Sequence, residues 1–158
     1  IAACSQVVER RNQGSVKIED IGIEIELGMN RHPLDAEELK NRGKNIAVVS
    51  NKFYAATQEI CRHFFGDLVD VAIGERENIK KKPAPDTVNE ALRQLHADRD
   101  RAVYIGDSDV DVFTAKNAGV SMLGVEWGFR GRKELTEAGA PQVAATADEL
   151  LNMILAQK

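Results

Sequence analysis

The stretch Ala102-Val103-Tyr104-Ile105-Gly106-Asp107-Ser108-Asp109-Val110-Asp111 decides the fold. Four apolar residues predict a buried strand, and a glycine followed by three closely spaced carboxylates comes directly after it. Such a group of acids is unfavourable unless a cation or a lysine compensates it. Oxygen ligands with room for water suit Mg²⁺. A helix dipole also favours acids at an N-terminus, which accounts for Asp109 but does not explain all three.

From Leu34 onward the chain alternates helix-like and strand-like segments, a pattern typical of a parallel sheet covered by helices. Strands are expected at 46–49, 68–73, 101–105 and 120–124, and a short one from 143. Helices are expected at 34–41, 53–65, 86–96 and 108–118, in a short segment ending near 139, and at 147–154. In 53–65 the apolar residues Phe53, Ala56, Ile60 and Phe64 recur at helical spacing. The sequence therefore predicts an α/β fold.

Residues 1–33 do not follow this alternation. Residues 2–11 are compatible with a helix, and residues 21–27 alternate apolar and polar side chains, as in a half-exposed strand. We expect this segment to form a separate layer or part of a small second domain.

Composition excludes several classes of protein. The 158 residues are 43% hydrophobic and 29% charged, as in one soluble globular domain. The net charge of −4 provides no basic field for nucleic acid. Cys4 and Cys61 make no disulfide framework, and no apolar run approaches the ~20 residues of a membrane span. We therefore expect a cytoplasmic protein with neither a nucleic-acid nor a membrane partner, in which neither cysteine takes part in the chemistry.

Polar residues follow several predicted strands, where ligands bind in open parallel α/β sheets. Ser50 suits a phosphate oxygen, although capping of the helix from Phe53 is the better explanation when Ser50 is taken alone. Lys82 precedes two prolines that restrict its backbone, and a fixed ammonium offsets phosphoryl charge. The alternative is a solvated lysine-rich loop, which suffices for Lys80 and Lys81. Asp107 and Asp111, which follow the strand at 101–105, are the remaining candidate site residues.

The order hydroxyl, lysine, then G-D-x-x-x-D resembles the second, third and fourth motifs of the haloacid dehalogenase superfamily of phosphohydrolases. The resemblance covers residues 34–158. Val48-Val49-Ser50-Asn51-Lys52, Lys82-Pro83-Ala84-Pro85 and Gly124-Val125-Glu126-Trp127-Gly128 are similar to the phosphoglycolate-phosphatase-like branch. The resemblance implies a Rossmann-like three-layer core with a parallel sheet, and a partial helical cap.

The resemblance also implies residue roles. Ser50 would hydrogen-bond the transferring phosphoryl group, and Asn51 would lie beside the phosphate or the substrate. Lys82 would stabilise phosphoryl charge. Asp107 would ligate Mg²⁺, while Asp111 would support the metal site or Lys82. The implied reaction is hydrolysis of a small phosphorylated metabolite through an aspartyl-phosphate.

The family's first motif, an apolar strand ending in D-x-D, is absent upstream of Ser50. The 49 preceding residues are also too few for that strand and a full helical cap. We therefore interpret residues 1–33 as a remnant of a cap or N-terminal segment, and residues 34–158 as a core lacking its first motif.

Other functions remain open on these residues. A non-catalytic relative would keep the phosphate-binding groups as a binding or scaffold module, and a phosphomutase would differ mainly in its cap. A phospho-acceptor receiver domain would place its acids before the hydroxyl and its lysine last, whereas here the acids follow both the hydroxyl and the lysine. Neither the substrate nor the oligomeric state follows from the sequence.

We expect a break in the chain upstream of Ser50, near Pro33, with the catalytic aspartate pair on a strand outside the 158 residues. Joined as written, the strands ending at Ser50 and Gly106 would lose the neighbour that the sheet of the similar family places between them. Each unpaired buried backbone group costs ~1–3 kcal/mol. Intact-mass measurement of the purified protein tests this. A mass well above 17.4 kDa supports the expectation, and a mass of 17.4 kDa favours a truncated or inactive member.

Overall fold

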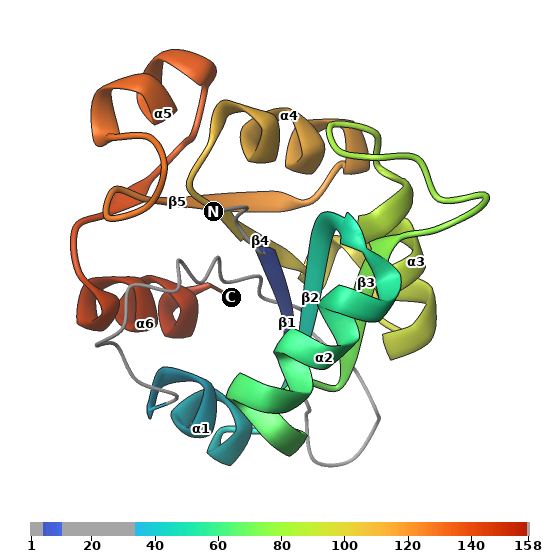
Figure 1. Ribbon diagram of the computed structural model, residues 1–158. Helices are drawn as coiled ribbons and strands as arrows, with labels where there is room; N and C mark the ends of the chain where they lie inside the picture. Colours follow the sequence, from blue (N-terminus) through green and yellow to red (C-terminus); the bar gives the residue numbers. More distant parts are fainter. Residues whose placement is uncertain (1–4, 11–33, 158) are drawn as a thin grey trace.

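The computed structural model describes residues 5–10 and 34–157, which form one sheet with helices on both faces (Figure 1). The strands are β1 (Ser5–Arg10), β2 (Lys44–Phe53), β3 (Val71–Glu75), β4 (Val103–Gly106), β5 (Ser121–Val125) and β6 (Val143–Ala144). The helices are α1 (Leu34–Asn41), α2 (Tyr54–Phe65), α3 (Asp86–Leu95), α4 (Asp109–Ala118), α5 (Arg132–Ala138) and α6 (Ala147–Ala156), with 3₁₀ turns at Gly66–Leu68 and Arg99–Arg101. The predicted α/β class is confirmed.

The strands of the sheet follow the order β3-β2-β1-β4-β5-β6. β2 pairs parallel with β3, and β4, β5 and β6 pair parallel with one another. β1 runs antiparallel to both β2 and β4, so β2 to β6 all point the same way. Their carboxyl ends therefore meet at one edge of the sheet, which we call the carboxyl edge.

β1 corrects two expectations. Residues 5–10 form a strand rather than part of a helix, because they pair with β2 on one side and β4 on the other. Such tertiary pairing overrides a weak local pattern. We expected β2 and β4 to lack the neighbour between them, but β1 lies there and pairs with both. The predicted strand at 21–27 and Cys4 lie outside the described residues, and the division at residue 33 stays a prediction.

Side chains on the two faces of the sheet form separate cores because successive strand residues point to opposite faces. On one face, Val49 and Tyr104 pack with apolar residues of α3, α4 and α5. On the other face, Ile46 and Ile105 pack with α1 and α6, and Val48 packs with α2. Strands buried on both faces explain the continuous apolar runs in the sequence. The result is a three-layer arrangement (Figure 1).

Helix α2 packs against the sheet through a face other than the one that carries the regularly spaced apolar residues of segment 53–65. Phe53 and Phe64 are 73% and 47% exposed, whereas the buried residues of the helix are Thr57 and Cys61. Small side chains let α2 approach the sheet closely, and at Gly74 of β3 a Cβ atom would collide with Thr57 Oγ1. Cys61 is buried among apolar residues.

Local signals set the ends of several elements. Thr146 caps α6 by accepting from Glu149 N–H, and Glu149 in turn accepts from Ala145 N–H. Gly119 ends α4 in the left-handed conformation. None of the helices in the described ranges is long and apolar enough to cross a membrane.

Candidate functional site

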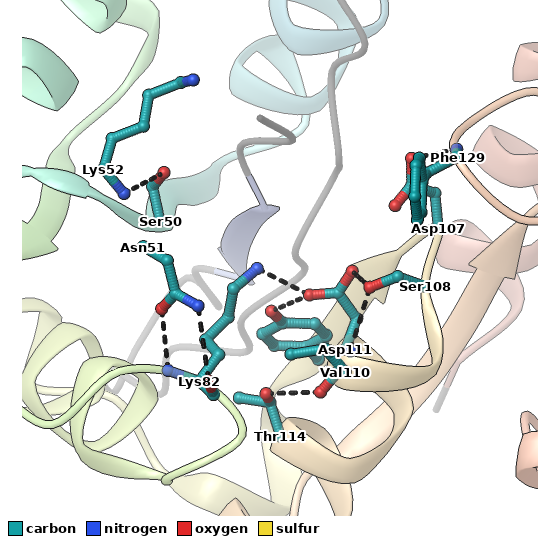
Figure 2. A network of polar contacts seen from close by, with 11 residues as sticks. Ser50, Asn51, Lys52, Lys82, Asp107, Ser108, Val110, Asp111, Thr114 and Phe129 are labelled. Atoms are coloured by element: carbon teal, nitrogen blue, oxygen red, sulfur yellow. Dashed lines mark hydrogen bonds and ion pairs between the residues drawn. The ribbon is translucent and has the colours of Figure 1, made fainter. Parts of the chain in front are cut away.

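The candidate residues lie at or near the carboxyl edge of the sheet, on segments far apart in sequence. Ser50 and Asn51 lie near the end of β2, and Lys82 is in the loop between β3 and α3. Asp107 directly follows β4, and Asp111 lies in the first turn of α4. Figure 2 shows Lys82 between Asn51 and Asp111, and Asp107 beside Phe129.

A buried ion pair joins the β3–α3 loop to α4. Lys82 Nζ lies 2.7 Å from Asp111 Oδ1, and the two side chains are 6% and 0% exposed. Tyr104 Oη donates to the same carboxylate oxygen at 2.7 Å. Ser108 Oγ donates to the other oxygen at 2.6 Å. Asp111 is thus surrounded by donors from three segments, which is what a buried carboxylate requires.

Burial raises the pKa of the Asp111 carboxyl, but its interactions outweigh that effect. The Coulombic attraction and hydrogen bond of Lys82, together with hydrogen bonds from the Ser108 and Tyr104 hydroxyls, hold the pKa below its ordinary value. Asp111 is therefore ionised at neutral pH. The stability that it contributes is present above its ordinary pKa and is lost as the pH falls through the lowered value.

The sequence around Asp111 explains its placement. Ser108 is the N-cap of α4 and accepts from Asp111 N–H at 3.3 Å, so Asp111 occupies the first turn, where the dipole favours an acid. A Cβ atom at Gly106 would overlap the Asp111 side chain. Glycine at the end of β4 thus lets Asp111 lie directly over the strand. Asp109 is half exposed, with Arg130 Nε at 3.4 Å, as expected of an acid that serves the helix terminus.

Two asparagines hold the backbone of the Lys82 loop. Lys82 N–H donates to Asn51 Oδ1 at 2.8 Å, and Asn51 Nδ2 donates to the Lys82 carbonyl at 3.3 Å. Asn117, on α4, donates from Nδ2 to the Pro83 carbonyl at 2.8 Å. Lys80 and Lys81 are exposed, as expected for a solvated loop, and Lys81 pairs with Glu75 at 3.0 Å.

Ser50 is fully buried within β2 and does not cap the following helix. Its Oγ accepts from Lys52 N–H at 3.1 Å, whereas the N-cap of α2 is Phe53, which makes no side-chain capping bond. The helix-cap interpretation of Ser50 is therefore wrong, because β2 continues three residues beyond it. The hydroxyl is oriented by a local backbone bond instead.

Asp107 is buried against the loop that follows β5. Phe129 N–H donates to its Oδ2, and Arg130 N–H donates to its backbone carbonyl at 2.9 Å. A Cβ atom at Gly128 would occupy the position of the Asp107 side chain. The Gly128–Phe129 turn therefore fixes Asp107 by direct contact, while Asp111 has different partners.

The structure adds residues to the predicted set. Tyr104 was expected only as a strand residue, yet its hydroxyl bonds to Asp111. Asn117 gave no signal in the sequence, because an asparagine late in a helix is ordinary. Gly106 and Gly128 belong to the motifs, but only the structure shows which carboxylate lies against each glycine.

The described residues fit Mg²⁺ in part. Asp107 offers carboxylate oxygen, the donor that Mg²⁺ prefers, and Mg²⁺ commonly takes one or two carboxylates together with water and phosphate. Asp111 is bound to Lys82, Tyr104 and Ser108. Within residues 5–10 and 34–157, no group of three or more Asp, Glu, His or Cys side chains is arranged to hold a metal. Among the described site residues, Asp107 is therefore the carboxylate that could hold Mg²⁺.

Comparison with known proteins relates this arrangement to one family. Residues 36–125 match the family model described as haloacid dehalogenase-like hydrolase. The chain is 36% identical over 95 residues to a phosphoglycolate phosphatase from Rhodobacter capsulatus, covering 60% of this chain and 42% of that protein. It is 27% identical over 120 residues to a pyrophosphatase from Halalkalibacterium halodurans, covering 73% and 54%.

A crystal structure from Lactobacillus delbrueckii subsp. bulgaricus, assigned as a phosphoglycolate phosphatase, superposes with a TM-score of 0.75 at 39% identity. The match covers 76% of this chain and 50% of that one. The chain spans about half the length of the curated relatives it matches.

Gly128→Ala tests the contact that fixes Asp107. The added methyl group would overlap the Asp107 carboxylate, so we expect a loss of about 1–3 kcal/mol in the free energy of unfolding, as for an overpacked core. Urea unfolding followed by circular dichroism measures it. Gly131→Ala in the same loop is the control, because its Cβ would meet only the end of the Glu134 side chain, and we expect a change within about 0.5 kcal/mol. Equal losses in the two variants would contradict the contact.

Proposed function

Because this chain belongs to the haloacid dehalogenase-like hydrolase family, we propose that it forms the core of a phosphatase acting on a small phosphorylated metabolite. The observation that supports this most strongly is the buried Lys82–Asp111 pair at the carboxyl edge, near Asp107 in the same motif. A permanently oriented ammonium is suited to negative charge that develops on a phosphoryl group. A solvated loop lysine would be neither buried nor paired in this way.

Each residue has a proposed role. The Lys82 ammonium binds a phosphoryl oxygen and offsets the charge that builds up there, while Asp111 holds the ammonium in its orientation. The Ser50 hydroxyl, which accepts from Lys52 N–H, donates its own hydrogen to a phosphoryl oxygen. Asp107 would hold Mg²⁺, and a bound Mg²⁺ would supply positive charge to neutralise the phosphate.

The proposed reaction requires a nucleophilic aspartate. Its carboxylate oxygen bonds to phosphorus while the phosphorus–oxygen bond to the leaving group breaks, and water then cleaves the aspartyl-phosphate. β1 lies between β2 and β4 in the sheet, and its residue at the carboxyl edge is Ser5. Its acidic residue, Glu9, lies opposite Asn45 in the strand register, towards the other edge. We therefore propose that the nucleophile lies outside the described residues.

The relatives narrow the substrate class. Phosphoglycolate and pyrophosphate, the substrates in the names of the similar proteins, are both small and carry a second anionic group beside the phosphoryl group. We therefore propose a compact, doubly anionic phosphate ester or anhydride as substrate. A non-catalytic phosphate-binding protein is the alternative outcome of the test.

Phosphate release from 2-phosphoglycolate and from pyrophosphate, measured with the full-length protein with and without Mg²⁺, tests the proposal. We expect Mg²⁺-dependent turnover that Asp107→Asn abolishes without unfolding the protein, and that Lys82→Ala lowers by about 10²–10³-fold. Lys80→Ala, in the same loop but exposed, should retain activity. Unchanged metal-independent turnover in Asp107→Asn would contradict the metal assignment. Phosphate binding without turnover of either substrate would favour the non-catalytic protein.

A further inference from the structure

The backbone at Lys82 is held by a single side-chain amide on both of its hydrogen-bonding groups. Asn51 Oδ1 accepts from Lys82 N–H at 2.8 Å, and Asn51 Nδ2 donates to the Lys82 carbonyl at 3.3 Å. An amide side chain has the donor and acceptor of a peptide group, so Asn51 acts like a neighbouring strand for one residue. The end of β2 is thereby tied to the Lys82 loop (Figure 2).

The next peptide is held from the opposite side. Asn117 Nδ2 donates to the Pro83 carbonyl at 2.8 Å, and Asn117 lies on α4, the helix that carries Asp111. With a rise of 1.5 Å per residue, Asp111 and Asn117 are about 9 Å apart along the helix axis. The Lys82 side chain thus meets the start of α4, while the backbone beside it meets the end of the same helix.

These contacts matter because a buried lysine needs an accurately placed backbone. The ammonium has a long, flexible stem, and its pairing with Asp111 offsets the cost of burial only if the geometry is good. Two of the residues that follow, Pro83 and Pro85, lack a backbone N–H, so this part of the loop has few donors with which to hold itself. Side chains from β2 and α4 supply the missing contacts.

We propose that Asn51 and Asn117 form an amide clamp that positions Lys82, so that Asn51 acts through the lysine rather than as a ligand of the substrate. The role of the clamp in turnover rests on the proposed phosphatase activity, whereas its effect on Lys82 does not. Removal of either asparagine releases the loop and exposes the amine.

Reductive methylation of the full-length protein, with mass spectrometry of each lysine, tests the clamp without any assay of activity. In the wild-type protein Lys82 should react more slowly than Lys80, which is exposed in the same loop. In Asn51→Ala and in Asn117→Ala the rate at Lys82 relative to Lys80 should rise about fivefold or more, as for loss of one net hydrogen bond.

The control is Gln58→Ala. Gln58 Nε2 donates to the Ala72 carbonyl at 2.7 Å, so this variant removes the same kind of bond from α2 without touching the loop, and it should leave the rate ratio unchanged. Asn117 is exposed and helical, so Asn117→Ala should fold even where Asn51→Ala does not. A ratio in Asn117→Ala equal to that of the wild type would overturn the clamp.

Kinetics distinguish positioning from substrate binding. We expect Asn51→Ala to lower kcat by about 10²-fold with little change in KM, because a displaced ammonium no longer meets the transition state. A rise in KM at unchanged kcat would make Asn51 a substrate ligand and overturn its positioning role. The labelling result decides the clamp even in a protein that releases no phosphate, since it reports exposure of the amine and not turnover.

Discussion

The buried ion pair of Lys82 and Asp111 is the interaction on which the organisation of the site depends. An ammonium and a carboxylate withdrawn from water cost several kcal/mol each unless attraction and further hydrogen bonds offset the loss. Asp111 meets that requirement with Lys82 and with the Tyr104 and Ser108 hydroxyls, while Asn51 and Asn117 bind the backbone of the loop that carries the ammonium. Strand β2, strand β4, helix α4 and the loop after β3 are thereby joined at one point.

This arrangement supports the proposal of phosphate chemistry at the carboxyl edge. The parallel strands β2 to β6 end there, so side chains distant in sequence arrive on the same side of the sheet. The two carboxylates that follow β4 then have separate partners: Asp111 is held by the lysine, and Asp107 by the Gly128–Phe129 turn. Two acids of the same motif therefore have different surroundings, which supports the different roles proposed for them.

Much of the fold followed from local pattern, and the exceptions have physical causes. Apolar runs bounded by glycine predicted most strands and helices from residue 34 onward, because strands buried on both faces leave a strong signal. β1 was not predicted, because this six-residue strand is stabilised by its pairing with β2 and β4 and not by a local sequence pattern. The motif order predicted which side chains lie at the edge. It could not show that Ser50 lies within β2, or which atoms each glycine accommodates, because those depend on tertiary distances.

A double-mutant cycle of Lys82→Met and Asp111→Asn, with free energies of unfolding from urea titrations at pH 7, tests the central claim most directly. Each single change leaves one buried charge uncompensated and should cost about 3–5 kcal/mol. The double variant should lose less than the sum, with a coupling energy of about 1–3 kcal/mol. Losses that add to within about 0.5 kcal/mol would show that the two residues act independently and would contradict the account.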